Sequence, residues 1–114
     1  MDHETCNNEL HVAVQRFITE RNWDRYHTPK NLAMSIAIEA AELMEHFQWV
    51  TNEQSIEIIQ DDVARVQVAD ELADILIYCL SFLNKIDVDI NTAILRKLRR
   101  DEDRYPIGRM PTED

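Results

Sequence analysis

Four carboxylates stand in two equally spaced pairs in this chain. Glu39 and Glu42 form the first pair, and Glu71 and Asp74 form the second. Because a spacing of three turns an α-helix by about 300°, both members of a pair would lie on one helix face. Four clustered carboxylates repel one another and resist ionising together. A bound cation would remove that repulsion, so the pattern predicts a metal site built by two helices that pack side by side.

The residues around the pairs argue against the simpler interpretation, a solvated acidic helix face. The first pair lies within the apolar run 36–43. In the second pair, apolar residues lie between the two acids and continue after them to residue 77. Carboxylates in such surroundings are costly unless they are paired or bound to a metal. The same spacing also occurs twice, on two separate predicted helices. Both features favour the metal site.

The ligand types indicate which metal such a site would take. Carboxylate oxygens without histidine suit Mg²⁺, with Mn²⁺ possible, better than zinc or copper. Di-iron helical bundles instead use a glutamate three residues before a histidine. The residue three before His46 is Leu43, so that step is missing. We therefore predict Mg²⁺ and metal-assisted phosphate chemistry.

The rest of the sequence predicts the helices that must position these acids. Gly108 is the single glycine, which favours an all-α chain and excludes a phosphate-binding P-loop or a dinucleotide-binding fingerprint. Apolar periodicity and capping residues predict four principal helices and one short helix. The predicted ranges are 7–21, 29–48, a short helix after Thr51 through Ile59, 63–83, and a last helix that begins after Asp87 or Asp89 and ends near Arg104. We expect a single domain over 1–114, a four-helix-bundle-like fold, with 1–6 and 107–114 as loose termini.

Charge and composition limit the partners. A net charge of −10 makes unaided binding to duplex nucleic acid unfavourable, whereas a small polyanion could still bind through metal ions. Six of the twelve cationic side chains lie near the C-terminus. No signal peptide opens the chain, no run reaches the length of a membrane span, and two cysteines do not make a disulfide framework. We expect a cytoplasmic protein without membrane contact.

Two longer segments resemble a known family. They are WDRYHTPKNLAMSIAIEAAELMEHFQW at 23–49 and DELADILIYCL at 70–80, and the match continues through Lys97 to the Arg-Tyr-Pro step at 104–106. The chain resembles the MazG-like all-α nucleoside triphosphate pyrophosphohydrolases, and it looks closest to their dCTP pyrophosphatase branch. The match covers most of the chain, from about Phe17 to Pro106.

The resemblance implies a Mg²⁺-dependent enzyme of nucleotide-pool cleaning. Such an enzyme hydrolyses a nucleoside triphosphate, with dCTP or a modified dCTP as the substrate expected here, to the monophosphate and pyrophosphate. The resemblance also implies a homodimer or homotetramer whose active sites are completed by neighbouring subunits. Carried over position by position, the metal-binding and catalytic acids are Glu39, Glu42, Glu71 and Asp74, and the substrate-binding residues are His27, Trp49, Tyr78, Lys97, Arg104 and Trp23.

The chain departs from the family pattern at two positions. Some members carry an acid directly before the first motif glutamate, where this chain has Ile38. The family often has asparagine four residues after the C-terminal lysine, where this chain has Asp101, which would repel phosphate unless it faces a metal or an arginine. The strong negative charge and amphipathic helices also leave an alternative function, a non-catalytic acidic helical module that binds a basic partner.

Overall fold

The computed structural model describes the backbone of residues 3–108 and the side chains of residues 9–108. The helices are α1 (His3–Glu20), the short 3₁₀-helix η1 (Asp24–Tyr26), α2 (Pro29–Glu45), α3 (Asn52–Ile58), α4 (Asp62–Lys85) and α5 (Ile90–Arg104). Within 3–108 there is no strand, so the predicted all-α fold class is confirmed. The terminal residues 1–2 and 109–114 of the segments expected to be loose lie outside the described residues.

Polar caps begin the helices where the sequence predicts them. The Thr28 hydroxyl accepts the N–H of Asn31 at the start of α2, 3.2 Å away, and Pro29 occupies the first helical position. Thr51 and Gln54 form the predicted capping box of α3. Asp89, rather than Asp87, caps α5. Each cap satisfies backbone N–H groups that the first helical turn leaves without partners.

Two helix boundaries differ from the prediction. Helix α1 begins at His3, before the expected start at Asn7. Helix α2 ends at Glu45 rather than near Gln48, because the N–H of Phe47 bonds to the carbonyl of Met44 only three residues earlier. That tighter bond closes the last turn and ends the α-helical register.

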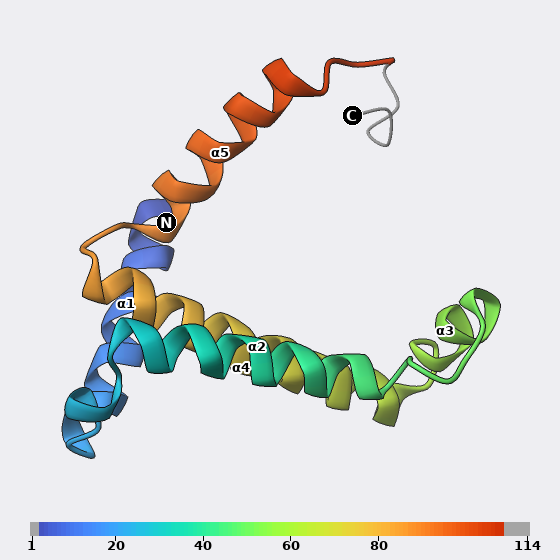
Figure 1. Ribbon diagram of the computed structural model, residues 1–114, viewed down its shortest axis with the longest axis horizontal. Coiled ribbons are helices and arrows are strands. Elements are labelled where there is room, and N and C mark those ends of the chain that lie inside the picture. Colours follow the sequence, from blue (N-terminus) through green and yellow to red (C-terminus); the bar gives the residue numbers. More distant parts are fainter. Residues whose placement is uncertain (1–2, 109–114) are drawn as a thin grey trace.

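The helices surround a small core. Helices α2 and α4 lie side by side and run antiparallel, α1 packs against α4 near one end of this pair, and α3 lies at the other end (Figure 1). The buried apolar side chains among residues 9–108 come from α1, α2 and α4, namely Ile18, Leu32 and Leu80. The α2–α4 pair is therefore the framework that carries both acidic motifs.

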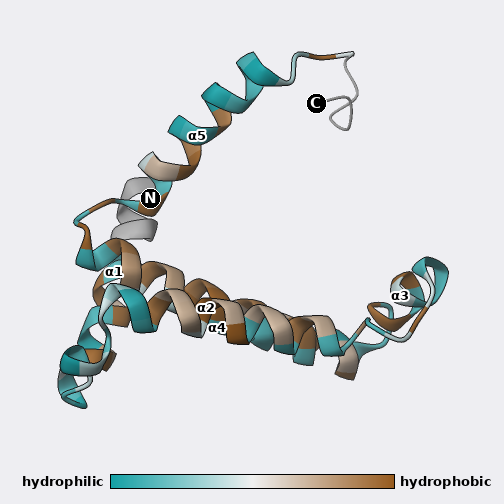
Figure 2. Cartoon of the chain, viewed as in Figure 1, coloured by the Kyte–Doolittle hydropathy of each residue, from teal (hydrophilic) through white to brown (hydrophobic). Residues whose placement is uncertain are grey.

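The chain is more open than a compact monomer of its size. Its radius of gyration is 17.0 Å, whereas about 13 Å is expected for a compact domain of this length. Its accessible surface is 9071 Å², against about 6500 Å² for a folded monomer of this mass. Helix α5, whose main contact is with α1, leaves Ile94 and Leu98 half exposed, and apolar residues alternate with polar ones along it (Figure 2). Among the described residues, no helix has the length and apolar character needed to cross a membrane.

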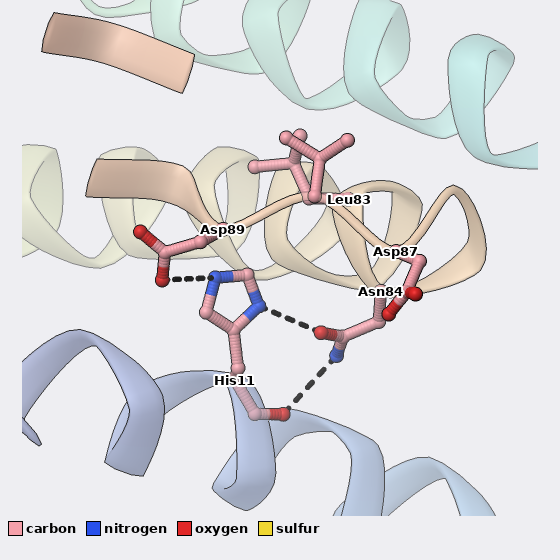
Figure 3. Close-up of a pocket in the computed structure, with 6 residues that line it drawn as sticks. His11, Leu83, Asn84, Asp87 and Asp89 are labelled. Atoms are coloured by element: carbon pink, nitrogen blue, oxygen red, sulfur yellow. Dashed lines mark hydrogen bonds and ion pairs between the residues drawn. The ribbon is translucent and has the colours of Figure 1, made fainter. Parts of the chain in front are cut away.

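A buried histidine joins α1, α4 and the start of α5. His11 Nδ1 lies 2.6 Å from Asn84 Oδ1, and the Asn84 amide donates back to the His11 carbonyl over 3.1 Å (Figure 3). The N–H of Ile90 donates to His11 Nε2 at 3.0 Å, so Nε2 is the acceptor and Nδ1 is the donor to Asn84. One imidazole ring therefore links three helices through directed hydrogen bonds.

We expect His11→Ala to lower the free energy of unfolding by about 2 kcal/mol, because it leaves Asn84 Oδ1 and the Ile90 N–H without their partners. Denaturant unfolding at a fixed protein concentration measures the change. Glu9→Ala, on the exposed side of the same helix, is the control. Equal stability of the two variants would contradict a structural role for this network.

Candidate active site

The packing of α2 on α4 brings three acids of the two motifs together. Glu39 and Glu42 on α2 and Glu71 on α4 each offer a carboxylate oxygen, and these oxygens all lie within 4.8 Å of one another. Asp74, one turn beyond Glu71, is not part of this group, and it lines a cavity beside the group together with Glu39. The two motifs thus face each other across the α2–α4 contact, and Asp74 lines the cavity.

The cluster shifts the protonation of its members. Burial, followed by the neighbouring carboxylates of Glu42, Asp74 and Glu71, raises the pKa of Glu39 to about 7. Burial also raises the pKa of Glu71, and the negative charges of Glu42 and Asp74 add to the effect. Both shifts have the same meaning: the ionised cluster is unfavourable until a positive charge joins it.

Two carboxylate oxygens of the cluster lack partners. Glu39 Oε2 and Glu71 Oε2 are buried, and no hydrogen-bond donor reaches them from the described part of the chain. Buried acceptors without partners are rare in proteins, because they lose their hydrogen bonds to water. An all-oxygen group with orphaned atoms fits a hard divalent cation.

An aromatic cavity of about 220 Å³ adjoins the acids. The ring centroids of Trp23 and His27 are 6.3 Å apart, those of His27 and Tyr78 are 6.2 Å apart, and Phe17 stacks edge-on against Trp23 at 5.6 Å. The lining residues are Phe17, Ile18, Trp23, His27, Glu39, Asp74, Ile77, Tyr78 and Ser81. A flat aromatic ligand with a charged tail could therefore lie between the rings and the carboxylates.

Asp24 fixes the segment that carries Trp23 and His27. Its carboxylate accepts hydrogen bonds from Gln15 at 3.1 Å, Thr19 at 3.2 Å and Lys85 at 3.2 Å. The bond from Gln15, followed by that from Lys85, lowers the pKa of Asp24. These contacts tie η1 to α1 and α4, which places the aromatic wall relative to the acids.

Some residues of this cavity were not singled out from the sequence. Ser81 is the clearest case, because it lies three residues after Tyr78 and seven after Asp74, which is the spacing of one helix face. This spacing is visible in the sequence, but a small polar residue within an apolar run is typical of a helix core position rather than of a functional site. Asp24 and Lys85 are distant in sequence, so only the fold could show their contact.

Three residues expected to bind substrate lie outside this cavity within the chain. Trp49 follows the end of α2 and is 87% exposed. Lys97 on α5 forms an ion pair with Asp101 one turn later. The Arg104 guanidinium lies over the Tyr105 ring, 5.3 Å from its centroid. None of them lines the cavity: Trp49 lies beyond the end of α2, and the main contact of α5 is with α1.

Comparison with known proteins gives consistent matches. The family model described as the MazG-like family matches residues 34–111. The chain is similar to dCTP pyrophosphatase 1 of Bos taurus, at 35% identity over 91 residues, which is 80% of this chain and 54% of that protein. The human dCTP pyrophosphatase 1 is 34% identical over 90 residues, 79% of this chain and 53% of that protein. The chain thus spans about half the length of these curated relatives.

A solved structure matches over nearly the full length of both chains. It is a pyrophosphatase from Archaeoglobus fulgidus DSM 4304, with a TM-score of 0.83 and 37% sequence identity. The match covers 93% of this chain and 97% of that one. The arrangement of helices that brings the acids together is therefore shared with that pyrophosphatase.

Proposed function

The chain belongs to the MazG-like family, and from that premise we propose that it hydrolyses a nucleoside triphosphate to the monophosphate and pyrophosphate. The observation that carries the proposal is the group of Glu39, Glu42 and Glu71, with two orphaned buried oxygens, beside an aromatic cavity. The names of the relatives, dCTP pyrophosphatase and pyrophosphatase, support the same reaction.

We assign the four acids to binding Mg²⁺, with Mn²⁺ as the alternative. When bound, a divalent ion would neutralise charge on the triphosphate and activate water for in-line attack on phosphorus. Glu39, Glu42 and Glu71 would hold the cation from the group that their carboxylates form, and Asp74 would contact it from the cavity wall. The carboxylates are brought together before the cation arrives, so little reorganisation would be needed.

The aromatic side of the cavity would hold the base. The rings of Trp23 and Tyr78 are each tilted against the His27 ring, with centroids 6.3 Å and 6.2 Å away, and a base could pack against these ring surfaces. The choice of dCTP or a modified dCTP rests on the relatives named for dCTP.

Trp49, Lys97 and Arg104 would serve the site of a neighbouring subunit in a homodimer or homotetramer. Their distance from the cavity of their own chain supports this assignment. The excess accessible surface and the half-exposed apolar side chains of α5 also support it, since subunit interfaces cover such surface. Cationic side chains from the partner would then neutralise the phosphates that the acids by themselves repel.

The test is a turnover panel. The protein is incubated with Mg²⁺ and each standard or base-modified nucleoside triphosphate, and monophosphate and pyrophosphate are separated by ion exchange. We expect both products in equal amounts, with dCTP or a modified dCTP preferred. No turnover by a folded oligomer, together with a melting temperature indifferent to Mg²⁺, would favour the acidic interaction module instead.

A further inference from the structure

A buried serine lies beside the aromatic wall of the cavity. Ser81 is 1% exposed, and its Oγ lies 3.4 Å from Nδ1 of His27. Across residues 9–108, His27 is the single hydrogen-bond partner that the Ser81 side chain has. A buried hydroxyl with a single partner donates its hydrogen to that partner. The reason is that a buried donor without an acceptor costs more free energy than a buried lone pair without a donor.

The surroundings of His27 favour a neutral ring. Burial, followed by the positive charge of Lys85 on α4, lowers the pKa of His27, and the opposite effect of the Asp24 carboxylate is weaker. Tyr78 faces the ring from α4, and Glu39 and Asp74 line the same cavity. A neutral imidazole has one acceptor nitrogen, and the Ser81 hydrogen needs that acceptor.

The backbone of His27 is also held in place. Its N–H donates to the carbonyl of Asp24 over 3.1 Å, and Asp24 is itself fixed by Gln15 and Lys85. The ring neighbours the rings of both Trp23 and Tyr78, and its Nδ1 lies on the Ser81 side. Position and orientation of the imidazole are therefore determined before a ligand binds.

We propose that Ser81 is a positioning residue that sets the tautomer of His27. The Ser81 hydroxyl donates to Nδ1, so the ring proton stays on Nε2, and Nε2–H offers a hydrogen bond to an acceptor atom of the nucleobase. The identity of the ligand rests on the proposed function. The tautomer does not, because it follows from contacts within the chain.

The first test reads the tautomer directly. Protein labelled for nitrogen NMR in its four histidines is compared with His27→Gln, which assigns the His27 signals. We expect His27 to hold its proton on Nε2 at neutral pH, and Ser81→Ala or the isosteric Ser81→Cys to give a mixture of tautomers. A proton on Nδ1, or a tautomer that neither variant changes, would overturn the inference.

The second test reads the effect on the substrate. We expect Ser81→Ala to raise KM by about 3- to 10-fold with a smaller change in kcat, and to have no further effect in the His27→Gln background. Ser55→Ala, which removes a hydroxyl on α3, should leave both constants unchanged. Additive effects of Ser81→Ala and His27→Gln would overturn the role in ligand binding. Absence of all nucleotide turnover would refute the proposed function, yet the NMR result would still stand.

Discussion

Replacing Glu39 with glutamine will make the metal-free protein more stable at pH 8 and will lower its Mg²⁺-dependent activity by about 10²- to 10³-fold. The amide keeps the size of the side chain but removes one negative charge from a partly buried cluster, in which carboxylate oxygens of Glu39, Glu42 and Glu71 lie within 4.8 Å of one another. The same change removes a ligand for the cation. Opposite effects on stability and on activity are characteristic of a group that is retained for function.

The pH dependence of the metal-free protein gives the sign of this effect. In the unfolded chain the pKa of Glu39 is near the ordinary glutamate value of 4.5, and in the folded protein its pKa is raised to about 7. Between these values the folded state binds more protons, so this group makes the free energy of unfolding fall as pH rises. Above pH 7 its contribution is constant. Mg²⁺ should restore the lost stability by binding the folded state.

Thermal unfolding between pH 4.5 and pH 8, with EDTA and with Mg²⁺, measures these changes. The difference in melting temperature between wild type and Glu39→Gln should grow from the lower to the upper end of that range in EDTA, and shrink or reverse in Mg²⁺. Glu45→Gln, an exposed glutamate on the same helix, should follow the wild type. A difference in melting temperature that stays constant across this pH range would show that the neighbouring carboxylates do not disfavour ionisation of Glu39.

Two inactive variants mixed together will recover activity. We expect Glu71→Ala to lose the cation and Lys97→Ala to lose a phosphate contact supplied to the neighbouring subunit. In a mixed dimer, one site combines the defective acids of the Glu71→Ala chain with the missing Lys97 of the other chain. The second site has the intact acids of the Lys97→Ala chain and the intact Lys97 of the Glu71→Ala chain. Random mixing makes half of the dimers mixed, so about one quarter of the wild-type activity should return.

Refolding equal amounts of the two variants together, followed by sizing and the nucleotide assay, measures this recovery. Each variant refolded by itself should stay inactive. A mixture of Glu71→Ala with Glu39→Ala is the control, because both defects lie in the acids of one chain. In that mixture every site contains one defective set of acids, so no activity should return. Recovery in the control, or none in the Glu71→Ala and Lys97→Ala mixture, would contradict a site shared between subunits.

The sequence was sufficient for the features that depend on local spacing. Steps of three residues put Glu39 with Glu42, and Glu71 with Asp74, on helix faces, and the capping threonines located the starts of α2 and α3. The resemblance in 23–49 and 70–80 indicated the family. These features depend on backbone geometry within a few turns of helix, so they can be recognised without the fold.

Only the tertiary structure decided which faces meet. Packing of α2 on α4 gathered Glu39, Glu42 and Glu71 and left Asp74 on the cavity wall, because helical spacing fixes a face but not its partner. The contact between Ser81 and His27 joins residues 54 positions apart, and no local pattern encodes it. Likewise, helix periodicity predicted α5, but only the fold showed that α5 packs mainly against α1 and that Lys97 lies outside the cavity of its own chain. The two paired carboxylate motifs could therefore be recognised in the sequence. Only the packing of α2 on α4 brings their carboxylates close enough to repel one another and to favour a bound cation.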